Sequence, residues 1–381
     1  MAHDDRLAAE GLSRRDVLAR LGWGSGAIGM LGAGPLPDFG ELRLRGLPAT
    51  AQDGRIKLSS NENPYGMCTA ARDRLQAELP NANRYPFAWG AELHTAIARH
   101  LGVAEANVAL GAGSTEILRM CAAAWSARGV LQAEPTFETL GSYTRAAGHP
   151  IHGVPVDSNG RHDLSAMQAR LGDVGVVYIC NPSNPASTLL PQAELDAFLD
   201  AVPDDKLVIM DEAYHEFVQA PDYQSQIDRA VDSPNIIVIR TFSKVYGMAG
   251  MRVGYVVGPR GLVRELDQYR TEMSVGVISA ACATTSLQDP DYAADQKRMN
   301  GEARRILEAG LRRLGLPFWE SQTNFVMCDL GRPMMPVNRA MAAEGVLVGR
   351  LFPAVPQGLR ISVGTPDQMH RCVDALASVL S

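Results

Sequence analysis

Between residues 107 and 258, the sequence alternates short runs of apolar, often β-branched residues with polar turns and stretches of helical periodicity. Strand-like runs cover residues 174–180 and 235–240, and each ends where polar residues begin. Strands that alternate with helices favour crossover connections between parallel strands. The pattern therefore predicts an α/β fold with a doubly wound, mainly parallel sheet.

Length and composition are those of a soluble globular enzyme. The chain has 381 residues, enough for about two domains, of which 20% are charged and 46% hydrophobic. The formal net charge is -6, and no lysine- or arginine-rich run occurs. Nucleic acids and membranes are therefore poor candidate partners, and a small-molecule substrate is expected.

The cysteines form neither a metal-binding pattern nor a disulfide pattern. They lack a C-x-x-C pair and any histidine spacing suited to zinc, and most have apolar neighbours. We expect no metal site, and we expect core thiols at Cys68, Cys121, Cys180, Cys282, Cys328 and Cys372.

Residues 1–50 differ from the rest of the chain. Arg14 and Arg15 precede a weakly apolar, glycine-rich run that is too short to span a membrane. A charged leader before such a run resembles a twin-arginine signal peptide, which implies export of the folded protein to the periplasm. The alternative is an amphipathic N-terminal helix that stays on a cytoplasmic protein.

Lys244 is the principal candidate for covalent chemistry. It follows the strand-like run 235–240, and ligands collect at the carboxyl ends of strands in open α/β sheets. An amine there forms a Schiff base with an aldehyde if burial or a nearby cation, such as Arg252, lowers its pKa. Arg252 also joins Thr241 and Ser243 in offering donors suited to a phosphate. These side chains indicate pyridoxal phosphate (PLP), although a solvated loop lysine gives a similar short string.

Two further strand ends carry polar residues suited to a heterocyclic ring. Asp211 ends the run LVIMD, where it would hold the proton of a pyridine nitrogen or simply cap the next helix. Tyr214 follows three residues later. Asn184 lies in a loop with two Asn-Pro pairs, from which its side chain can donate a hydrogen bond into the site.

Other junctions allow a functional and a structural interpretation. Gly113 and Ser114 begin a helix in GAGSTEIL, where backbone N–H groups favour a phosphate but an ordinary capped turn has the same sequence. Phe137 would lie on a flat ring or belong to the core. In SSNENPYG, a functional role is open, but Asn61, Glu62 and Asn63 could also simply cap the helix that begins near Thr69.

Taken in order, these strings resemble the fold-type I PLP-dependent aminotransferases, and within them the histidinol-phosphate aminotransferase-like branch. The resemblance covers about residues 55–375 and rests jointly on SSNENPYG, NRYP, GAGSTEIL, EPTF, CNPSNP, DEAY, TFSK, GMRVGY and LRISVGT. It implies an N-terminal arm at residues 51–80, a large PLP-binding domain at 81–290 and a smaller α+β domain at 291–381. It also implies ping-pong Schiff-base transfer of an amino group between an amino acid, or a histidinol phosphate-like amine, and a 2-oxo acid.

The resemblance implies a role for each residue around the cofactor ring. Lys244 would be the Schiff-base lysine and the proton shuttle. Asp211 would face the pyridine nitrogen, and Phe137 would stack on the ring. Asn184 and Tyr214 would bond the phenolic oxygen.

The phosphate and the substrate have implied partners as well. Phosphate contacts would come from Gly113, Ser114, Thr241, Ser243 and Arg252. Tyr85 would reach the phosphate from the other subunit of a homodimer. Arg360, in LRISVGT, would bind the substrate α-carboxylate. Further substrate contacts would come from Asn184, Arg350 and Tyr65.

Ser187 marks a departure from the family pattern. The family commonly has Thr-Gly where this chain has Ala186 and Ser187. Because serine favours an ordinary, negative φ, we expect the loop geometry, and with it substrate handling, to differ here while Asn184 keeps its contact.

In the C-terminal part, we expect a long helix at residues 293–314 and a strand near residues 324–328. Within GVLVGRLFP we expect a strand that carries Arg350. Arg350 is either a surface arginine or a cation for the distal group of the substrate, which could be a phosphate, an acidic group or an aromatic ring.

Two other classes of function stay open. A decarboxylase, β-lyase or amine oxidase would use the same cofactor residues, because contacts with the substrate side chain decide which Cα bond breaks. A non-catalytic binding protein of the same fold is less consistent with intact Lys244, Asp211 and Arg252. A dinucleotide site is excluded, because GAGSTE lacks the third glycine and the partner acid.

Overall fold

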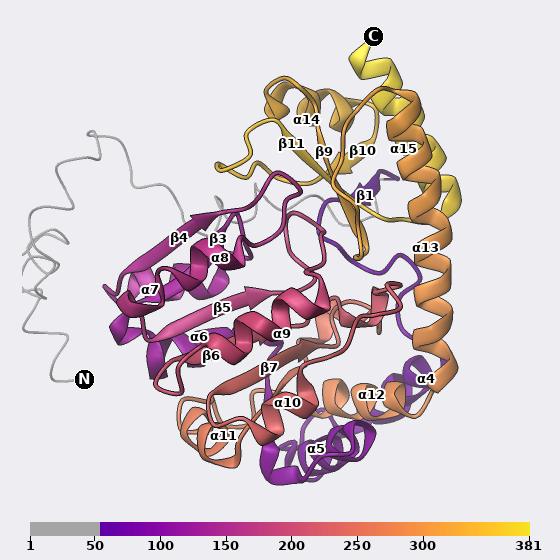
Figure 1. Ribbon diagram of the computed structural model, residues 1–381. Helices are drawn as coiled ribbons and strands as arrows, with labels where there is room; N and C mark the ends of the chain where they lie inside the picture. The colour runs from indigo at the N-terminus through magenta and orange to yellow at the C-terminus, as the bar shows by residue number, and fades with distance from the viewer. Residues whose placement is uncertain (1–53) are drawn as a thin grey trace, which may run out of the picture. The chain divides into compact units, whose positions relative to one another are not determined.

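The fold is built around a seven-stranded central sheet (Figure 1). The computed structural model describes residues 54–381, and Gly54–Ser381 form one unit. The strand order is β2-β8-β7-β6-β5-β3-β4. The twin-arginine signal predicted at residues 1–50 lies outside the described residues.

All strands of this sheet run in one direction except β8, which is antiparallel to both of its neighbours. The strands are β2 (Val108–Gly111), β3 (Val130–Glu134), β4 (Ile151–Pro155), β5 (Val176–Cys180), β6 (Leu207–Asp211), β7 (Ile236–Thr241) and β8 (Gly254–Val257). The prediction of a mainly parallel sheet is confirmed. Because β5, β6 and β7 are parallel neighbours, the polar residues that follow them meet at one edge.

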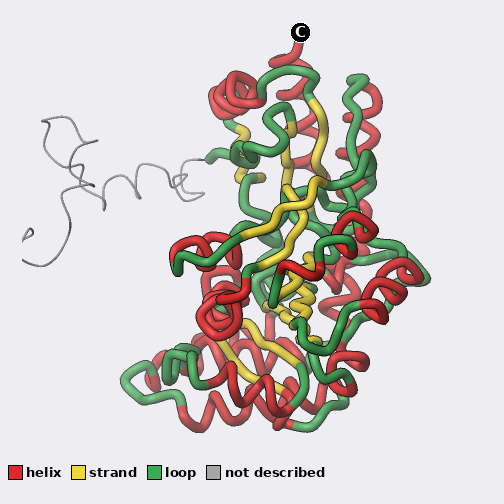
Figure 2. The backbone as a smooth tube through the Cα atoms, turned by 60° about the vertical axis from the view of Figure 1, so that its left-hand side comes forward, coloured by secondary structure: helices red, strands yellow, loops and turns green. Residues whose placement is uncertain are grey.

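Helices cover both faces of the sheet (Figures 1 and 2), so its strands are buried on two sides, except the edge strand β4, which is mostly half-buried. In β5, Val177 and Ile179 face one core, while Val176 and Tyr178 face the other. The first core also includes residues of α4 (Thr69–Glu78), α5 (Phe87–Leu101), α8 (Leu164–Gln168), α9 (Gln192–Ala201), α10 (Ile227–Asp232) and α12 (Val277–Leu287). The second includes residues of α6 (Ser114–Trp125), α7 (Thr139–Ala146) and α11 (Arg260–Asp267).

A third core lies in the C-terminal part of the chain. Its elements are β1 (Ile56–Leu58), β9 (Phe325–Asp329), β10 (Val346–Val348), β11 (Gly358–Ser362), α13 (Pro290–Arg313), α14 (Met334–Ala343) and α15 (Pro366–Leu380). Strand β1 pairs with β10 in parallel, and β9 pairs with β11 antiparallel. Helix α13 packs Tyr292 against the first core and contributes Leu307 to this one. The predicted long helix and the strand near residues 324–328 are therefore confirmed.

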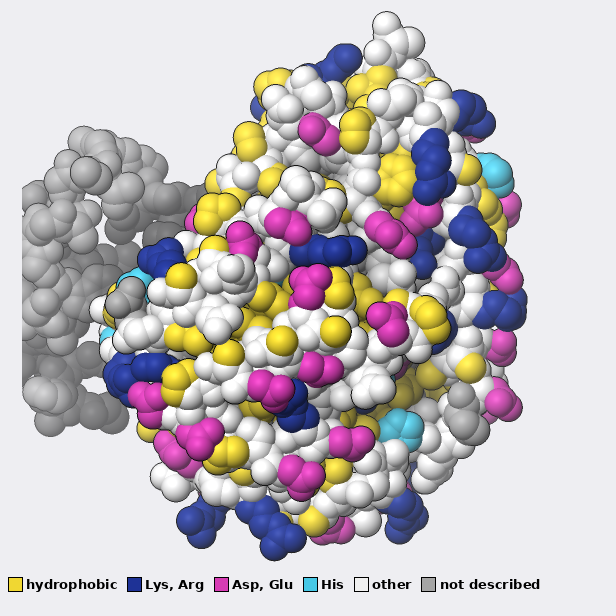
Figure 3. Space-filling model, in the orientation of Figure 1, with side chains coloured by type: hydrophobic (Ala, Val, Ile, Leu, Met, Phe, Trp, Pro, Cys, Tyr) yellow, Lys and Arg dark blue, Asp and Glu magenta, His cyan; other side chains and the backbone are white. Residues whose placement is uncertain are grey.

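One face of the described residues mixes charges of both signs. On the face drawn in Figure 3, Lys and Arg side chains are interspersed with Asp and Glu side chains, and apolar side chains lie between them. This face therefore presents no field of a single sign. None of the helices in residues 54–381 combines the length and the apolar character that a bilayer span needs.

All six cysteines are free and buried, as expected for core thiols. Burial raises the pKa of most of these thiols, for example that of Cys282 to about 11. Such thiols stay protonated and are poor nucleophiles.

A buried ion pair joins the ends of β6 and β7. Nη2 of Arg240 lies 2.9 Å from Oε2 of Glu212, and the Ser225 hydroxyl and the Gln226 N–H also donate to this carboxylate. Burial opposes ionisation, but Arg240 and these donors hold the pKa of Glu212 below its ordinary value. The pair thus braces the edge of the sheet at which the polar loops meet.

Glu216 lies close to this pair, but one of its carboxylate oxygens lacks a partner among the described residues. Its Oε2 is buried and accepts no hydrogen bond from the described residues. Burial raises its pKa from 4.5 to about 7, against the field of Arg240. Because the folded protein binds this proton more tightly than the unfolded chain, stability from this group is present below pH about 4.5 and is lost as the pH rises towards about 7.

We expect Glu216→Gln to be more stable than the wild type at pH about 8, by on the order of 2 kcal/mol, and nearly equal to it at pH about 4.5. The measurement is thermal unfolding of both proteins across this pH range. Glu302→Gln, on α13, serves as the control for a carboxylate that is paired with an arginine, Arg298. A Glu216→Gln advantage that does not change with pH would contradict the assignment.

Candidate active site

Lys244 lies in the loop after β7, with its amine among polar groups from distant parts of the chain. Nζ donates to the carbonyl oxygen of Asn61 at 3.4 Å and lies 5.3 Å from the centroid of the Tyr214 ring. Burial and then the positive charge of Arg360 lower its pKa to about 8. Arg252, the cation expected from the sequence, contributes less than Arg360. A fraction of this amine is neutral near pH 7, as a nucleophilic amine must be.

Asp211, Asn184 and Tyr214 lie at the same edge of the sheet. The Asn184 Nδ2 donates to the Tyr214 hydroxyl oxygen at 3.1 Å. Asp211 ends β6 and is buried, and burial raises its pKa. The chain beyond it forms a single 3₁₀ turn, His215–Phe217, so Asp211 does not cap an α-helix. A buried carboxylate of this kind is ionised most readily beside a positive partner, such as a protonated ring nitrogen.

The residues predicted to hold a phosphate come together. A Cβ added at Gly113, where φ is 76°, would lie 2.2 Å from Nη2 of Arg252, so only glycine allows this approach. Arg252 Nη1 donates to the Ser243 hydroxyl oxygen at 3.2 Å, and the Thr241 hydroxyl donates to it at 2.9 Å. Helix α6 begins at Ser114, and no side chain caps it. Free N–H groups, two hydroxyls and a guanidinium therefore fit a phosphate.

Arg360, on β11, points into the same region. Its Nη1 donates to Oδ1 of Asn184 at 2.8 Å, and its Nη2 donates to the carbonyl oxygen of Ser59 at 3.0 Å. The guanidinium lies over the rings of Phe325 and Phe352, 5.5 and 5.0 Å from their centroids. Its Nε is buried and has no acceptor among the described residues. Arg360 thus has a buried N–H that can still pair with a carboxylate.

Arg350 is not in a strand, so that prediction is wrong. β10 ends at Val348, and the N–H of Gly349 donates to the carbonyl oxygen of Arg360 at 2.8 Å. Nη2 of Arg350 lies 2.6 Å from Oε2 of Glu138, and its guanidinium lies 4.4 Å from the centroid of the Phe352 ring. The charges of Arg350 and Glu138 both act on the pKa of Arg360. The Arg350–Glu138 pair is therefore a partly exposed neighbour of Arg360.

Three other predicted residues make no hydrogen bond or ion pair with this cluster among residues 54–381. Phe137 lies between β3 and α7 and packs against the second core. Tyr65 lies towards α13, where burial and then the charge of Glu302 raise the pKa of its hydroxyl. Tyr85 is 73% exposed. The described chain alone therefore does not bring Tyr65 or Tyr85 to Lys244.

Asn61 is a site residue for which the sequence left a functional role and a helix cap equally open. Its Nδ2 donates to the Tyr214 hydroxyl oxygen at 3.1 Å, and its carbonyl oxygen accepts from Lys244 and from Asn324. The Ser362 hydroxyl donates to its Oδ1 at 3.0 Å. Its φ is 54°, a conformation that asparagine tolerates better than most residues.

The capping interpretation of Asn61 is wrong. Helix α4 begins at Thr69, and the Sγ of Cys68 accepts from the N–H of Ala71 at 3.4 Å. The signal that pointed to Asn61 was its place in SSNENPYG, the first string of the family pattern. Tyr178 carried no signal at all, because it lies within the apolar run of β5.

The loop after β5 also differs from expectation. Ser187 has φ 70°, so the prediction of an ordinary φ is wrong. Its N–H donates to the carbonyl oxygen of Ser183 at 2.9 Å, and its own carbonyl oxygen accepts from Gln322 at 2.9 Å. These bonds hold a conformation that glycine adopts more easily. The loop thus has a glycine-like backbone at Ser187.

We expect Ser187→Gly to stabilise the protein by about 1 kcal/mol without loss of activity. A non-glycine residue in the left-handed region costs roughly 1–2 kcal/mol, and the Ser187 hydroxyl is buried without a partner among the described residues. Ser183→Gly is the matched control, because Ser183 lies in the same loop with an unpaired buried hydroxyl but without a positive φ. Thermal unfolding tests both, and equal effects of the two changes would argue against strain at Ser187.

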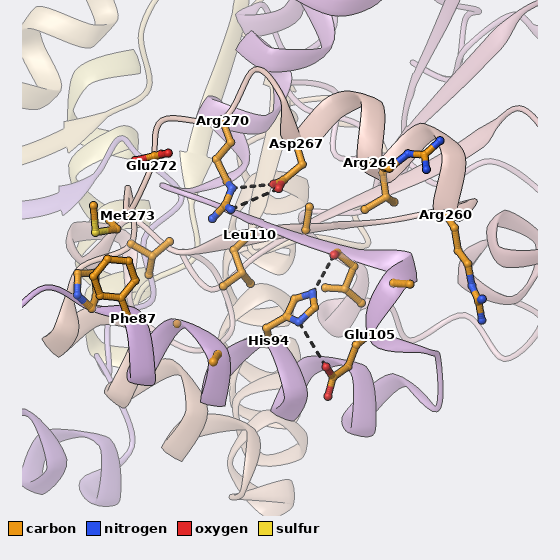
Figure 4. Close-up of a pocket in the computed structure, with 18 of the residues that line it drawn as sticks. Phe87, His94, Glu105, Leu110, Arg260, Arg264, Asp267, Arg270, Glu272 and Met273 are labelled. Atoms are coloured by element: carbon orange, nitrogen blue, oxygen red, sulfur yellow. Dashed lines mark hydrogen bonds and ion pairs between the residues drawn. The ribbon is translucent and has the colours of Figure 1, made fainter.

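A cavity of about 970 Å³ lies away from the polar cluster (Figure 4). It is lined by parts of α5, β2 and α11, with Phe87 and Met273 at one end and Arg260 and Arg264 at the other. His94 contacts the carbonyl oxygen of Val108 at 2.9 Å within it. None of the predicted PLP residues lines this cavity. The volume of this cavity therefore does not locate the active site. The cavity lies beside the exposed Phe87 instead.

Comparisons with known proteins identify the family. The model of aminotransferase class I and II matches residues 53–376. Histidinol-phosphate aminotransferase 2 of Pseudomonas fluorescens is 38% identical over 330 residues, which is 86% of this chain and 89% of that protein. Histidinol-phosphate aminotransferase of Bacillus subtilis is 34% identical over 333 residues, or 86% and 92% of the two chains.

A solved structure agrees with the fold. The crystal structure of histidinol-phosphate aminotransferase from Sinorhizobium meliloti in complex with pyridoxal-5'-phosphate superposes with a TM-score of 0.80 at 27% identity. The match covers 91% of this chain and 98% of that one. The described residues therefore have the fold of a PLP-binding enzyme.

Proposed function

This chain belongs to the aminotransferase class I and II family and is a PLP-dependent aminotransferase of fold type I, and on that premise we propose roles for its site residues. Lys244 is the residue that bonds the cofactor aldehyde. The observation that carries this role is the burial of Lys244 between Asn61 and Tyr214, where the charge of Arg360 helps to lower the pKa of its amine.

When bound, PLP supplies an aldehyde that takes up amino groups and a ring that accepts electrons. Lys244, with its lowered pKa, takes a proton from the Cα of the amino donor. In the second half of the reaction it delivers a proton to the Cα of the amino acid that forms from the 2-oxo acid. Asp211 holds the proton of the ring nitrogen. Asn184 and Tyr214 hold the phenolic oxygen, and Phe137 covers the ring.

The phosphate binds among Gly113, Ser114, Thr241, Ser243 and Arg252. The support for this is the approach of Arg252 to Gly113, together with the uncapped start of α6. The same residues would hold the cofactor in place throughout the reaction.

The substrates are an amino donor and a 2-oxo acid, and we propose that Arg360 binds their α-carboxylate. Arg350 would face the distal group of the side chain. The named relatives act on histidinol phosphate, so the amino donor is either an amino acid or an amine of that kind. The role predicted for Tyr65 stays a prediction, and its position towards α13 gives it no support.

A panel of amino donors tests the proposed function. The purified holoenzyme is mixed with each donor. Loss of the absorbance of the cofactor bonded to its lysine reports transfer of the amino group. Conversion by amino acids or by histidinol phosphate, with a 2-oxo acid restoring the absorbance, is the expected result. Release of carbon dioxide from the donor, with no transfer of its amino group to a 2-oxo acid, would point to a decarboxylase instead.

The Arg350–Glu138 pair leads to a prediction about substrate choice. Glu138 neutralises Arg350, so Glu138→Gln is expected to lower KM for donors with an anionic distal group by up to about fivefold, because an exposed ion pair is worth about 0.2–1 kcal/mol. Donors with an aromatic side chain should change little. Glu344→Gln, which breaks the surface pair with Arg371, is the control. An equal effect on all donors would remove Arg350 from the distal end of the site.

We propose that Tyr85 reaches the phosphate of a second copy, since PLP aminotransferases are in general dimers. Its 73% exposure leaves it available to a partner, and Phe87 beside it is 70% exposed. Tyr85→Phe is expected to weaken PLP binding even though this hydroxyl has no partner within the described chain. Unchanged PLP affinity would exclude Tyr85 from the site.

We propose that residues 81–290 and 291–381 act as the large and the small domain, and that residues 51–80 form an arm. The separate C-terminal core supports this division, although α13 spans two cores. Crystal structures with and without a substrate analogue test it. Rotation of residues 291–381 as one body is expected, and a boundary at another position would overturn it.

We propose that Arg14 and Arg15 belong to a twin-arginine signal that exports the folded holoenzyme. Changing both arginines to lysine should leave the full-length, active enzyme in the cytoplasm. Fractionation and N-terminal sequencing of the wild type decide the question. An uncleaved wild-type chain found only in the cytoplasm would refute export and leave the enzyme assignment intact.

A further inference from the structure

Tyr178, a residue of the central sheet, contacts Asp211 directly. It lies on β5, is fully buried, and its hydroxyl donates to Oδ2 of Asp211 on β6 at 2.7 Å. In the register of the two strands, Cys180 pairs with Asp211, and Tyr178 lies two residues before Cys180 on the same face. Its ring therefore runs along the sheet towards the edge where the cofactor residues meet.

The two oxygens of Asp211 are held by different donors. Oδ1 accepts from the N–H of Ala213 at 3.1 Å, and among the described residues Oδ2 accepts from Tyr178. A carboxylate has about four lone-pair sites, so two remain, and one of these can accept from a ring N–H. The titratable groups whose charges act with that of Asp211 come from β5, α6 and the loops after β6 and β7, and they are Tyr178, Cys180, Cys121, Glu212, Tyr214 and Lys244.

We propose that Tyr178 is a positioning residue for transamination, whose hydroxyl keeps the Asp211 carboxylate ionised and oriented towards the cofactor ring. This proposal rests on the role proposed above for Asp211. An O–H donated to a carboxylate in a dry site is a strong, charge-assisted hydrogen bond that favours the ionised form. A neutral Asp211 could not hold a proton on the ring nitrogen, so Tyr178 acts on the reaction without touching the substrate.

Tyr178→Phe is the direct test, since phenylalanine keeps the ring in the core and removes only the donor. PLP is expected to dissociate from this variant about tenfold more readily, which corresponds to about 1.4 kcal/mol. Loss of the donor favours protonated Asp211, so the acid limb of the kcat profile should move up by about one pH unit. KM for the amino donor should change little.

Tyr255→Phe is the matched control. Tyr255 is also a buried tyrosine of the central sheet, on β8, and no hydrogen bond joins its hydroxyl to Asp211 in the described chain. Its PLP affinity and acid limb should match those of the wild type. A fluorinated tyrosine introduced at Tyr178 provides the opposite change, because a more acidic phenol donates more strongly and should move the acid limb down.

Measuring Asp211→Asn in parallel separates the two roles. Wild-type PLP affinity and acid limb in Tyr178→Phe, beside a damaged Asp211→Asn, would overturn the proposal for Tyr178 alone. An unaffected Asp211→Asn would overturn both roles. A lower melting temperature of apo Tyr178→Phe with an unchanged acid limb would reduce Tyr178 to a core residue, and would also overturn the proposal.

Discussion

Lys244→Ala is expected to abolish transamination, with a loss of at least about 10³-fold, while the protein stays folded and binds PLP noncovalently. The proposed phosphate and ring contacts are shared among Asp211, Asn184, Ser243 and Arg252, none of which is changed. Only Lys244 offers an amine of lowered pKa in this cluster. The apo protein should keep its melting temperature, because the change removes a buried charge and leaves the core intact.

The attachment point can be identified with little ambiguity. The whole chain has four lysines, Lys57, Lys206, Lys244 and Lys297. Borohydride reduction of the wild type followed by peptide mapping should place the cofactor on Lys244. Lys297→Ala is the control and should retain activity and labelling. Cofactor found on any of the other three lysines would sink the assignment.

Arg360→Ala is expected to raise KM for the amino donor by on the order of 30-fold or more, because truncating one partner of a buried ion pair costs about 2–5 kcal/mol. PLP affinity should fall far less. The change also frees Oδ1 of Asn184, which accepts from Arg360 at 2.8 Å. A small decrease in kcat is therefore expected beside the large effect on KM.

Arg360→Lys separates charge from geometry. Lysine keeps the positive charge but not the planar fork of donors, so it should restore only part of the lost affinity. The loss should be seen with carboxylate donors and be smaller with histidinol phosphate, which has no α-carboxylate. An unchanged KM in Arg360→Ala would place the carboxylate elsewhere in the site.

The polar residues at the ends of the strands could be predicted, because they depend on local sequence. The apolar run before Lys244, the aspartate at the end of LVIMD and the glycine at Gly113 each have a pattern that is read within about ten residues. Parallel strands place their carboxyl ends at one edge whatever the details of packing. That rule was enough to bring Asp211, Asn184 and Lys244 together.

Other features could not be predicted, because distant segments create them. The pairing of Arg350 with Glu138 joins residues 212 positions apart, and the contact of Asn61 with Ser362 joins residues 301 apart. The φ of Ser187 is set by hydrogen bonds to Ser183 and Gln322, against the preference of serine itself. No periodicity or turn signal carries such information.

The sequence by itself determined the parallel sheet, the family and most of the polar residues that meet at one edge of the sheet, since these follow from strand periods, strand ends and an ordered set of motifs. Tertiary structure alone decided which charge lowers the pKa of Lys244, which side chain donates to Asp211 and which carboxylate pairs with Arg350. The reason is physical: burial and the field of a neighbouring charge depend on distances in space, and only the packed chain sets those distances.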